Sequence, residues 1–162
     1  MIPAYLPPYP PAPPAAQLRR GVSTAYYALF HLLVHETMAR TIADATLRAD
    51  LSRMIGHEST KAVCNEYAAA QPDHVGHLKI KSGAVIPAQL QSIGSAFVTL
   101  IEARHSADYD TQTTKDPTHA EAFIYLMTAE NAFLDWVAIQ GDKATGAMLT
   151  KIFMASLSKR KS

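Results

Sequence analysis

The chain has 162 residues, of which 48% are hydrophobic and 18% are charged, and its formal net charge is +1 at pH 7. This composition is typical of a globular domain, and it excludes a disordered chain as well as one that attracts nucleic acid through its overall charge. The single cysteine, Cys64, excludes an intramolecular disulfide and a multi-cysteine zinc site, so we expect a reducing, cytoplasmic compartment.

The first 14 residues contain seven of the ten prolines. Proline fixes φ and has no N–H to donate, so residues 1–14 are predicted to form an extended segment. They lack the basic start and clean apolar core of a signal peptide, and no uninterrupted apolar run approaches the roughly 18 residues of a membrane span. We therefore expect a helical domain over residues 15–158, a basic tail over residues 159–162 and no membrane attachment.

Apolar residues recur at helical spacing over residues 15–42 and predict a long first helix. Asp44 fits the N-cap of a second helix that stops near Gly56, and a shorter helix is predicted over residues 58–70. Residues 71–87 contain Pro, Asp, Gly and Ser, a composition typical of a connecting loop.

Two later prolines mark the next helices. Pro87 and Pro117 suit the first turn of a helix and predict helices over residues 87–110 and 117–140. A last amphipathic helix is predicted from residue 142, and no alternating strand pattern of convincing length is present. The expected fold is therefore all-α, an antiparallel bundle of four to five helices with a Pro-rich N-terminal extension.

The apolar stripe of the fourth predicted helix ends in charged residues. Helical spacing brings Arg104 and Asp108 onto the face of the preceding apolar residues, where the two charges offset each other. One interpretation is that Arg104 binds phosphate through its fork of donors, with His105 or Tyr109 assisting proton transfer. The other interpretation is a polar plug that holds the end of the bundle together.

The first predicted helix carries a second polar set. Arg20, Ser23 and Tyr27 share one face of this helix, and His31 lies on an adjacent strip. His31 and His35 have the i, i+4 spacing of zinc ligands, but no third ligand accompanies them. We therefore expect two ordinary bundle histidines, with no metal and no other cofactor.

Two residues near the predicted third helix, His57 and Cys64, are expected to have structural roles. His57 directly follows Gly56, and its side chain either caps the following helix or extends a polar cluster. We expect it to be a cap. Cys64 lies on an apolar helix face and is expected to be an inert core residue.

Several segments together resemble small bacterial HEPN-domain proteins. "LRRGVSTAYYALFHLLVHE" is similar to their first helix, "GHESTKAVC" to a second recurring segment, and "QSIGSAFVTLIEARHSADYD" and "AENAFLDW" to the later helices. The resemblance spans roughly residues 17–136 and implies a bundle of four to five helices that pairs as a homodimer. Members of the family bind or cleave RNA, or act as partners of small nucleotidyltransferases in toxin–antitoxin and defence systems.

The ribonuclease members of this family use an arginine followed, after four to six intervening residues, by a histidine, and they need no metal. Arg104 matches the arginine, but Tyr109, Asp110 and Thr111 occupy the positions where the histidine falls. Tyrosine titrates at about 10 and is a poor general base at neutral pH. We therefore expect a HEPN-like module that binds RNA, a nucleotide or a partner protein.

The expected binding residues come from the first and fourth predicted helices and from the break before the third. They are Arg20, Ser23, Tyr27, His31, His57, Arg104, Asp108, Tyr109 and Asp110. Two alternatives stay open. One is a toxin-like, metal-independent endoribonuclease that uses Arg104 and His105, which requires a helix kink that turns His105 inward. The other is a nucleotidyltransferase partner in which Tyr109 receives a nucleotide.

Overall fold

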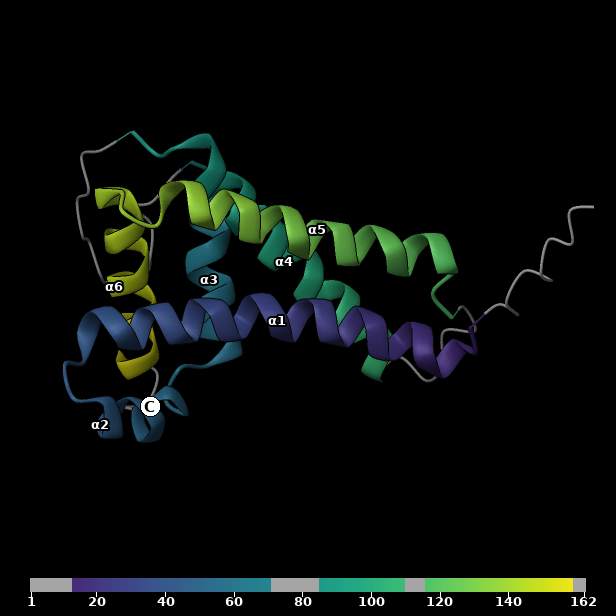
Figure 1. The fold of residues 1–162 in the computed structure, drawn as a ribbon, viewed down its shortest axis with the longest axis horizontal. Helices are drawn as coiled ribbons and strands as arrows, with labels where there is room; N and C mark the ends of the chain where they lie inside the picture. The colour runs from purple at the N-terminus through teal and green to yellow at the C-terminus, as the bar shows by residue number, and fades with distance from the viewer. Residues whose placement is uncertain (1–12, 71–84, 110–115, 159–162) are drawn as a thin grey trace, which may run out of the picture.

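The computed structural model describes residues 13–70, 85–109 and 116–158. These residues form six α-helices and no strand, which confirms the all-α class (Figure 1). The helices are α1 (Ala15–Thr41), α2 (Ala45–Ser52), α3 (His57–Ala68), α4 (Ala88–Tyr109), α5 (His119–Ile139) and α6 (Lys143–Ser158). Most of the Pro-rich extension, the basic tail and Asp110 lie outside the described residues.

Two helix starts are fixed by side chains that accept backbone hydrogen bonds. Asp44 accepts from the N–H groups of Thr46 and Leu47 at 2.8 and 3.2 Å, so the predicted N-cap of α2 is confirmed. At the start of α5, Thr118 and Glu121 form a reciprocal capping box. Pro117 therefore precedes the cap, and its predicted place inside the first turn of α5 is wrong.

The long helices α1 and α5 run side by side along the molecule, and α4 crosses them obliquely and packs against both (Figure 1). Near the start of α1, Val22 packs with Ala107 near the end of α4 and with Ala122 near the start of α5. Near the end of α1, Arg40 donates a hydrogen bond to the carbonyl oxygen of Gln140, just after α5. Helix α4 therefore runs antiparallel to α1, whereas α5 runs parallel to α1. The structure thus differs from the predicted bundle in this parallel pair and in having six described helices.

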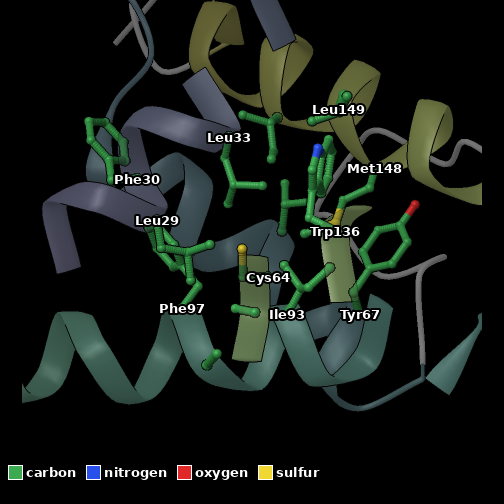
Figure 2. Packing of buried hydrophobic residues seen from close by; sticks show 14 of the residues in the cluster. Leu29, Phe30, Leu33, Cys64, Tyr67, Ile93, Phe97, Trp136, Met148 and Leu149 are labelled. Atoms are coloured by element: carbon green, nitrogen blue, oxygen red, sulfur yellow. The ribbon is translucent and has the colours of Figure 1, made fainter. Parts of the chain in front are cut away.

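The core lies beside the C-terminal half of α1, where α6 packs against α1 and α3 packs against α4 and α6 (Figure 1). Leu29 of α1, Phe97 of α4, Trp136 of α5 and Met148 of α6 are all buried there, around Cys64 of α3 (Figure 2). Burial raises the pKa of the Cys64 thiol, which keeps it protonated. The expectation of a core cysteine is confirmed.

Helices α3 and α4 are in backbone contact at Gly94. A Cβ atom at this position would lie 2.6 Å from the carbonyl oxygen of Cys64 and 3.0 Å from the amide nitrogen of Ala68. Only a residue without a side chain allows this approach. Gly94 therefore sets how closely α3, which begins at His57, packs against α4.

Helix α5 is apolar on almost every side, but much of it is exposed. Among the described residues it alone has the length and apolarity of a membrane span, and 28% of its most apolar 18-residue stretch is buried. No uninterrupted apolar run reaches that length, because Glu130 and Asn131 fall near the middle of the helix. The outward side chains include Phe123, Ile124 and Leu134.

Candidate functional site

A polar and aromatic cluster forms where the N-terminal half of α1 meets the end of α4 and the start of α3. Because α1 and α4 are antiparallel, Ser23 faces Asp108 and Tyr27 faces Arg104. The first residue of α3 adds an imidazole. We call this set the Arg104 cluster, and its members are Ser23, Tyr26, Tyr27, His31, His57, Arg104 and Asp108.

The Arg104 guanidinium is held in a fixed orientation. Its Nε donates to Oδ2 of Asp108 at 2.8 Å, and its Nη2 donates to the hydroxyl of Tyr27 at 2.9 Å. Its central carbon also lies 5.3 Å from the ring centroid of Tyr27 and 5.8 Å from that of Tyr26. The side chain is only 11% exposed, so these contacts hold a largely buried cation at the edge of the core.

Asp108 links α4 back to α1. While Oδ2 accepts from Arg104, Oδ1 accepts from the hydroxyl of Ser23 at 2.6 Å. The predicted Arg104–Asp108 pair is confirmed. It also explains how a carboxylate is tolerated in the last turn of α4, because the arginine one turn earlier offsets its repulsion from the helix dipole.

His57 joins the cluster through Tyr26. The buried Tyr26 hydroxyl lies 2.5 Å from Nδ1 of His57. Burial raises the pKa of Tyr26, so the phenol keeps its proton. The pKa of His57 is lowered, first by burial and second by the positive charge of Arg104, so the imidazole is neutral at pH 7.

This pair also fixes which ring nitrogen carries the proton. A phenol is a stronger donor than a neutral imidazole, so Tyr26 donates to Nδ1 and His57 carries its own proton on Nε2. His57 therefore offers an N–H donor. Our expectation that His57 caps α3 is wrong, because Gly56 occupies the N-cap without a side-chain hydrogen bond and His57 turns toward Tyr26.

The outer edge of the cluster consists of exposed histidines. The His31 ring stacks on the ring of Tyr27, with a centroid distance of 6.1 Å and an interplanar angle of 26°. His31 and His105 are both exposed, and both lie close enough to His57 to lower its pKa. Arg20 is exposed one turn before Ser23 on α1.

Other residues that the sequence suggested for a site do not join the Arg104 cluster in the described structure. Helix α4 is α-helical through Tyr109, and His105 is exposed on it, so His105 is not turned inward as the endoribonuclease alternative requires. The side chain of Tyr109 and the whole of Asp110 lie outside what the structure describes. Within the described ranges, no group of three His, Cys, Asp or Glu side chains comes together as a metal site, and His35 faces Glu36 at 3.6 Å.

A separate cavity of about 470 Å³ lies between the first turns of α1, the C-terminal half of α4 and the start of α5. Its walls include Arg19 and Asp116, which form an ion pair, together with Glu102 and Glu121. Sequence reasoning did not find it, because Arg19 and Asp116 are 97 positions apart. The only local signal near this cavity is the Thr118–Glu121 spacing of the capping box, which marks the start of α5.

Comparisons of the chain with family models, with curated proteins and with solved structures found no match.

Proposed function

We propose that the chain is a non-catalytic, HEPN-like helical module that binds single-stranded RNA at the Arg104 cluster. One observation carries the proposal: a guanidinium fixed by Tyr27 and Asp108 lies beside the half-buried ring of Tyr27, on which the exposed ring of His31 stacks. A fixed guanidinium suits a phosphate oxygen, and the exposed outer ring of the stack, His31, suits an unpaired base. The resemblance to HEPN-domain proteins supports the same function, in a cytoplasmic toxin–antitoxin or defence system.

The donors of the cluster support phosphate binding. The neutral His57 has its proton on Nε2 and adds an uncharged N–H donor near Arg104. His57 is also the first residue of α3, whose N-cap, Gly56, supplies no side-chain acceptor. A helix start without a side-chain cap favours an anion, because its first N–H groups and the helix dipole both attract negative charge.

The same donors argue against catalysis. A general base needs an available lone pair, whereas Nδ1 of His57 accepts from Tyr26 and Nε2 holds a proton. His105 is exposed on a regular helix. The cluster therefore binds a phosphodiester better than it activates a ribose hydroxyl.

The proposal is tested by fluorescence anisotropy with a labelled single-stranded RNA of about ten nucleotides, in chelator. The full chain is expected to bind it, and Arg104→Ala to weaken binding by about tenfold or more, because a charge-assisted contact is lost. Arg53→Ala is the matched control, since Arg53 is exposed and is not part of the cluster. Absence of binding, or an equal loss in both variants, would overturn the proposal.

The same samples distinguish the alternatives. Shortened RNA in chelator that stays intact with Arg104→Ala would indicate the endoribonuclease instead. A mass increase by one nucleotide in cells, lost in Tyr109→Phe, would indicate a nucleotidyltransferase partner. Folding of every variant is checked by circular dichroism, so a lost function is not confused with an unfolded protein.

A further inference from the structure

Helix α5 has small residues on its buried side and large apolar residues on its exposed side. Ala122, Ala129 and Ala132 are buried against the rest of the fold. Seven large side chains are exposed by between 36% and 65%, and they are Phe123, Ile124, Leu126, Met127, Phe133, Leu134 and Val137. We call these seven residues the α5 face. A group of exposed apolar side chains on one helix marks an interaction site, whereas single exposed ones do not.

Four members of the α5 face form a line along the helix. Phe123, Leu126, Phe133 and Val137 are separated by three, seven and four residues, and these spacings place side chains one above another on a helix. At a rise of about 1.5 Å per residue, Phe123 and Phe133 are about 15 Å apart along the axis. The line therefore offers two aromatic rings at a defined separation.

The described part of the chain begins beside the start of the α5 face. Because α1 and α5 are parallel, their first turns lie at the same end of the molecule (Figure 1). Val22 packs with Ala122, so the first residue of α1, Ala15, lies about 10 Å beyond the start of the α5 face along the helix axis. Residues 1–12, which lie outside the described part of the chain, are therefore tethered next to this face.

The preceding segment is also long enough to cover the α5 face. A polyproline helix rises about 3.1 Å per residue, so twelve residues span about 37 Å. Returning from the start of α1 to the level of Phe123 uses about 10 Å of this length. The remaining length of about 27 Å exceeds the rise of about 21 Å from Phe123 to Val137.

The composition of this segment matches an apolar and partly aromatic surface. Residues 1–12 contain five prolines and no charged residue. Their large side chains are Ile2, Tyr5, Leu6 and Tyr9. With three residues per turn, these four side chains occupy two adjacent edges of a polyproline helix and so lie on one side of it. Proline-rich segments dock on aromatic surfaces because little conformational entropy is lost when they are ordered.

We propose that residues 1–12 dock on the α5 face of the same chain and run antiparallel to α5. Tyr9 then lies against Phe123. Tyr5, about 12 Å further along the extended segment, lies against Phe133. The direct connection to α1 keeps the segment at a roughly millimolar effective concentration, so individually weak apolar contacts are enough to hold it.

Two comparisons favour this occupant. The docking does not depend on RNA binding, since the Arg104 cluster is built from α1, α3 and α4. In a lipid bilayer the exposed Glu130 carboxylate near the middle of α5 would lie in hydrocarbon, where a charge is costly. A docked segment instead brings tyrosine hydroxyls, which can donate to a carboxylate.

The first test is photo-cross-linking of the full chain with p-benzoylphenylalanine in place of Tyr5, which keeps an aromatic ring at that position. At micromolar concentration we expect links within one chain between the tryptic peptide of residues 1–19 and that of residues 116–143, which contains all of α5. The same photoreactive residue in place of Leu47 is the matched control. Leu47 is 50% exposed on α2, beyond the far end of α1, and should give no link to residues 1–19.

Three outcomes of this experiment would overturn the proposal. The first is the absence of links to residues 116–143, and the second is links between two chains, which would indicate that a second copy covers the α5 face. The third is a wild-type chain that sediments with phosphatidylcholine vesicles, which would indicate a lipid surface as the occupant. Circular dichroism checks that each substituted chain is folded.

The second test reads whether the segment covers the α5 face. Tyr5→Ser combined with Tyr9→Ser should uncover the face and raise the fluorescence of bound anilinonaphthalene sulfonate by about threefold or more. Ala4→Ser combined with Pro7→Ser is the matched control, because these positions lie on the third edge of the polyproline helix, away from α5. Unchanged emission from the buried Trp136 would show that the fold is intact. Equal dye binding by the wild-type chain and the tyrosine variant would overturn the proposal.

Discussion

The hydroxyl of Tyr26 and Nδ1 of His57 lie 2.5 Å apart, although the two residues are 31 positions apart in the sequence. This hydrogen bond joins the buried face of α1 to the first residue of α3. It also orients the imidazole: Nδ1 points toward the buried Tyr26 hydroxyl, so the rest of the ring is directed toward the end of α4. The same hydrogen bond therefore helps to hold α1 and α3 together and positions the N–H donor of His57 in the Arg104 cluster.

Tyr26→Phe is expected to lower the free energy of unfolding by about 1–2 kcal/mol, because it leaves the partly buried Nδ1 of His57 without its donor. Urea denaturation at pH 7 measures the change. Comparison with His57→Gln and with the double variant isolates the pairwise part. Strictly additive losses would contradict a direct bond between the two side chains.

The lowered pKa of His57 predicts a loss of stability in mild acid. An unfolded histidine takes up its proton near pH 6.5, whereas the folded His57, shifted first by burial and then by Arg104, takes it up at a lower pH. Between these values the unfolded chain binds more protons, so the free energy of unfolding falls as the pH drops below about 6.5.

Urea denaturation at pH 7.5 and 5.5 checks this expectation. His57→Gln should reduce the difference between the two values, because it removes the titrating group. His35→Gln is the control, since the His35 side chain is 77% exposed and should leave the difference unchanged. An equal effect of the two variants would show that His57 is not the group responsible.

Gly94→Ala is expected to cost about 1–3 kcal/mol or more, because the new methyl group would overlap backbone atoms of α3 that cannot rotate away. Gly21→Ala is the matched control in α1, where a Cβ atom meets nothing within 4 Å. It should stabilise the protein by about 0.5–1 kcal/mol through helix propensity. Thermal or urea denaturation of both variants should therefore give shifts of opposite sign.

Asp108→Asn separates orientation from charge in the Arg104 cluster. If Asp108 acts mainly by holding Arg104, its loss should weaken RNA binding by about fivefold, equivalent to about 1 kcal/mol at 25 °C. If net charge alone mattered, removing a carboxylate beside a phosphate would strengthen binding. Anisotropy titrations at two salt concentrations decide between these outcomes, and tighter binding by the variant would contradict the positioning role.

Local signals in the sequence predicted much of the helical framework. Asp44 could be recognised as a cap because its acceptors, the N–H groups of Thr46 and Leu47, are two and three residues away. The Arg104–Asp108 pair could be predicted for the same reason, since both residues lie on one helix. The capping box of Thr118 and Glu121 has an equally local signal, because the two residues are three positions apart.

Long-range relationships were beyond the reach of such reasoning. Ser23 and Asp108 meet only because α1 and α4 are antiparallel, and they are 85 positions apart. The parallel pairing of α1 with α5 depends on where α2, α3 and α4 carry the chain. In α5, apolar residues surround the helix, so the pattern could not show that Ala129 is buried while Leu134 is exposed.

The close approach at Gly94 fixes the separation of α3 and α4 through backbone atoms and without side chains of the Arg104 cluster. Backbone atoms of α3 and α4 set the separation of these helices, and the side chains of His57 and Arg104 extend from that fixed framework. Replacing Ser23, Tyr27, His31 or His57 would therefore alter which chemical groups face a ligand without removing this backbone contact between α3 and α4. A library at these four positions, with Gly94 kept, would be a direct way to engineer new ligand preferences on this scaffold.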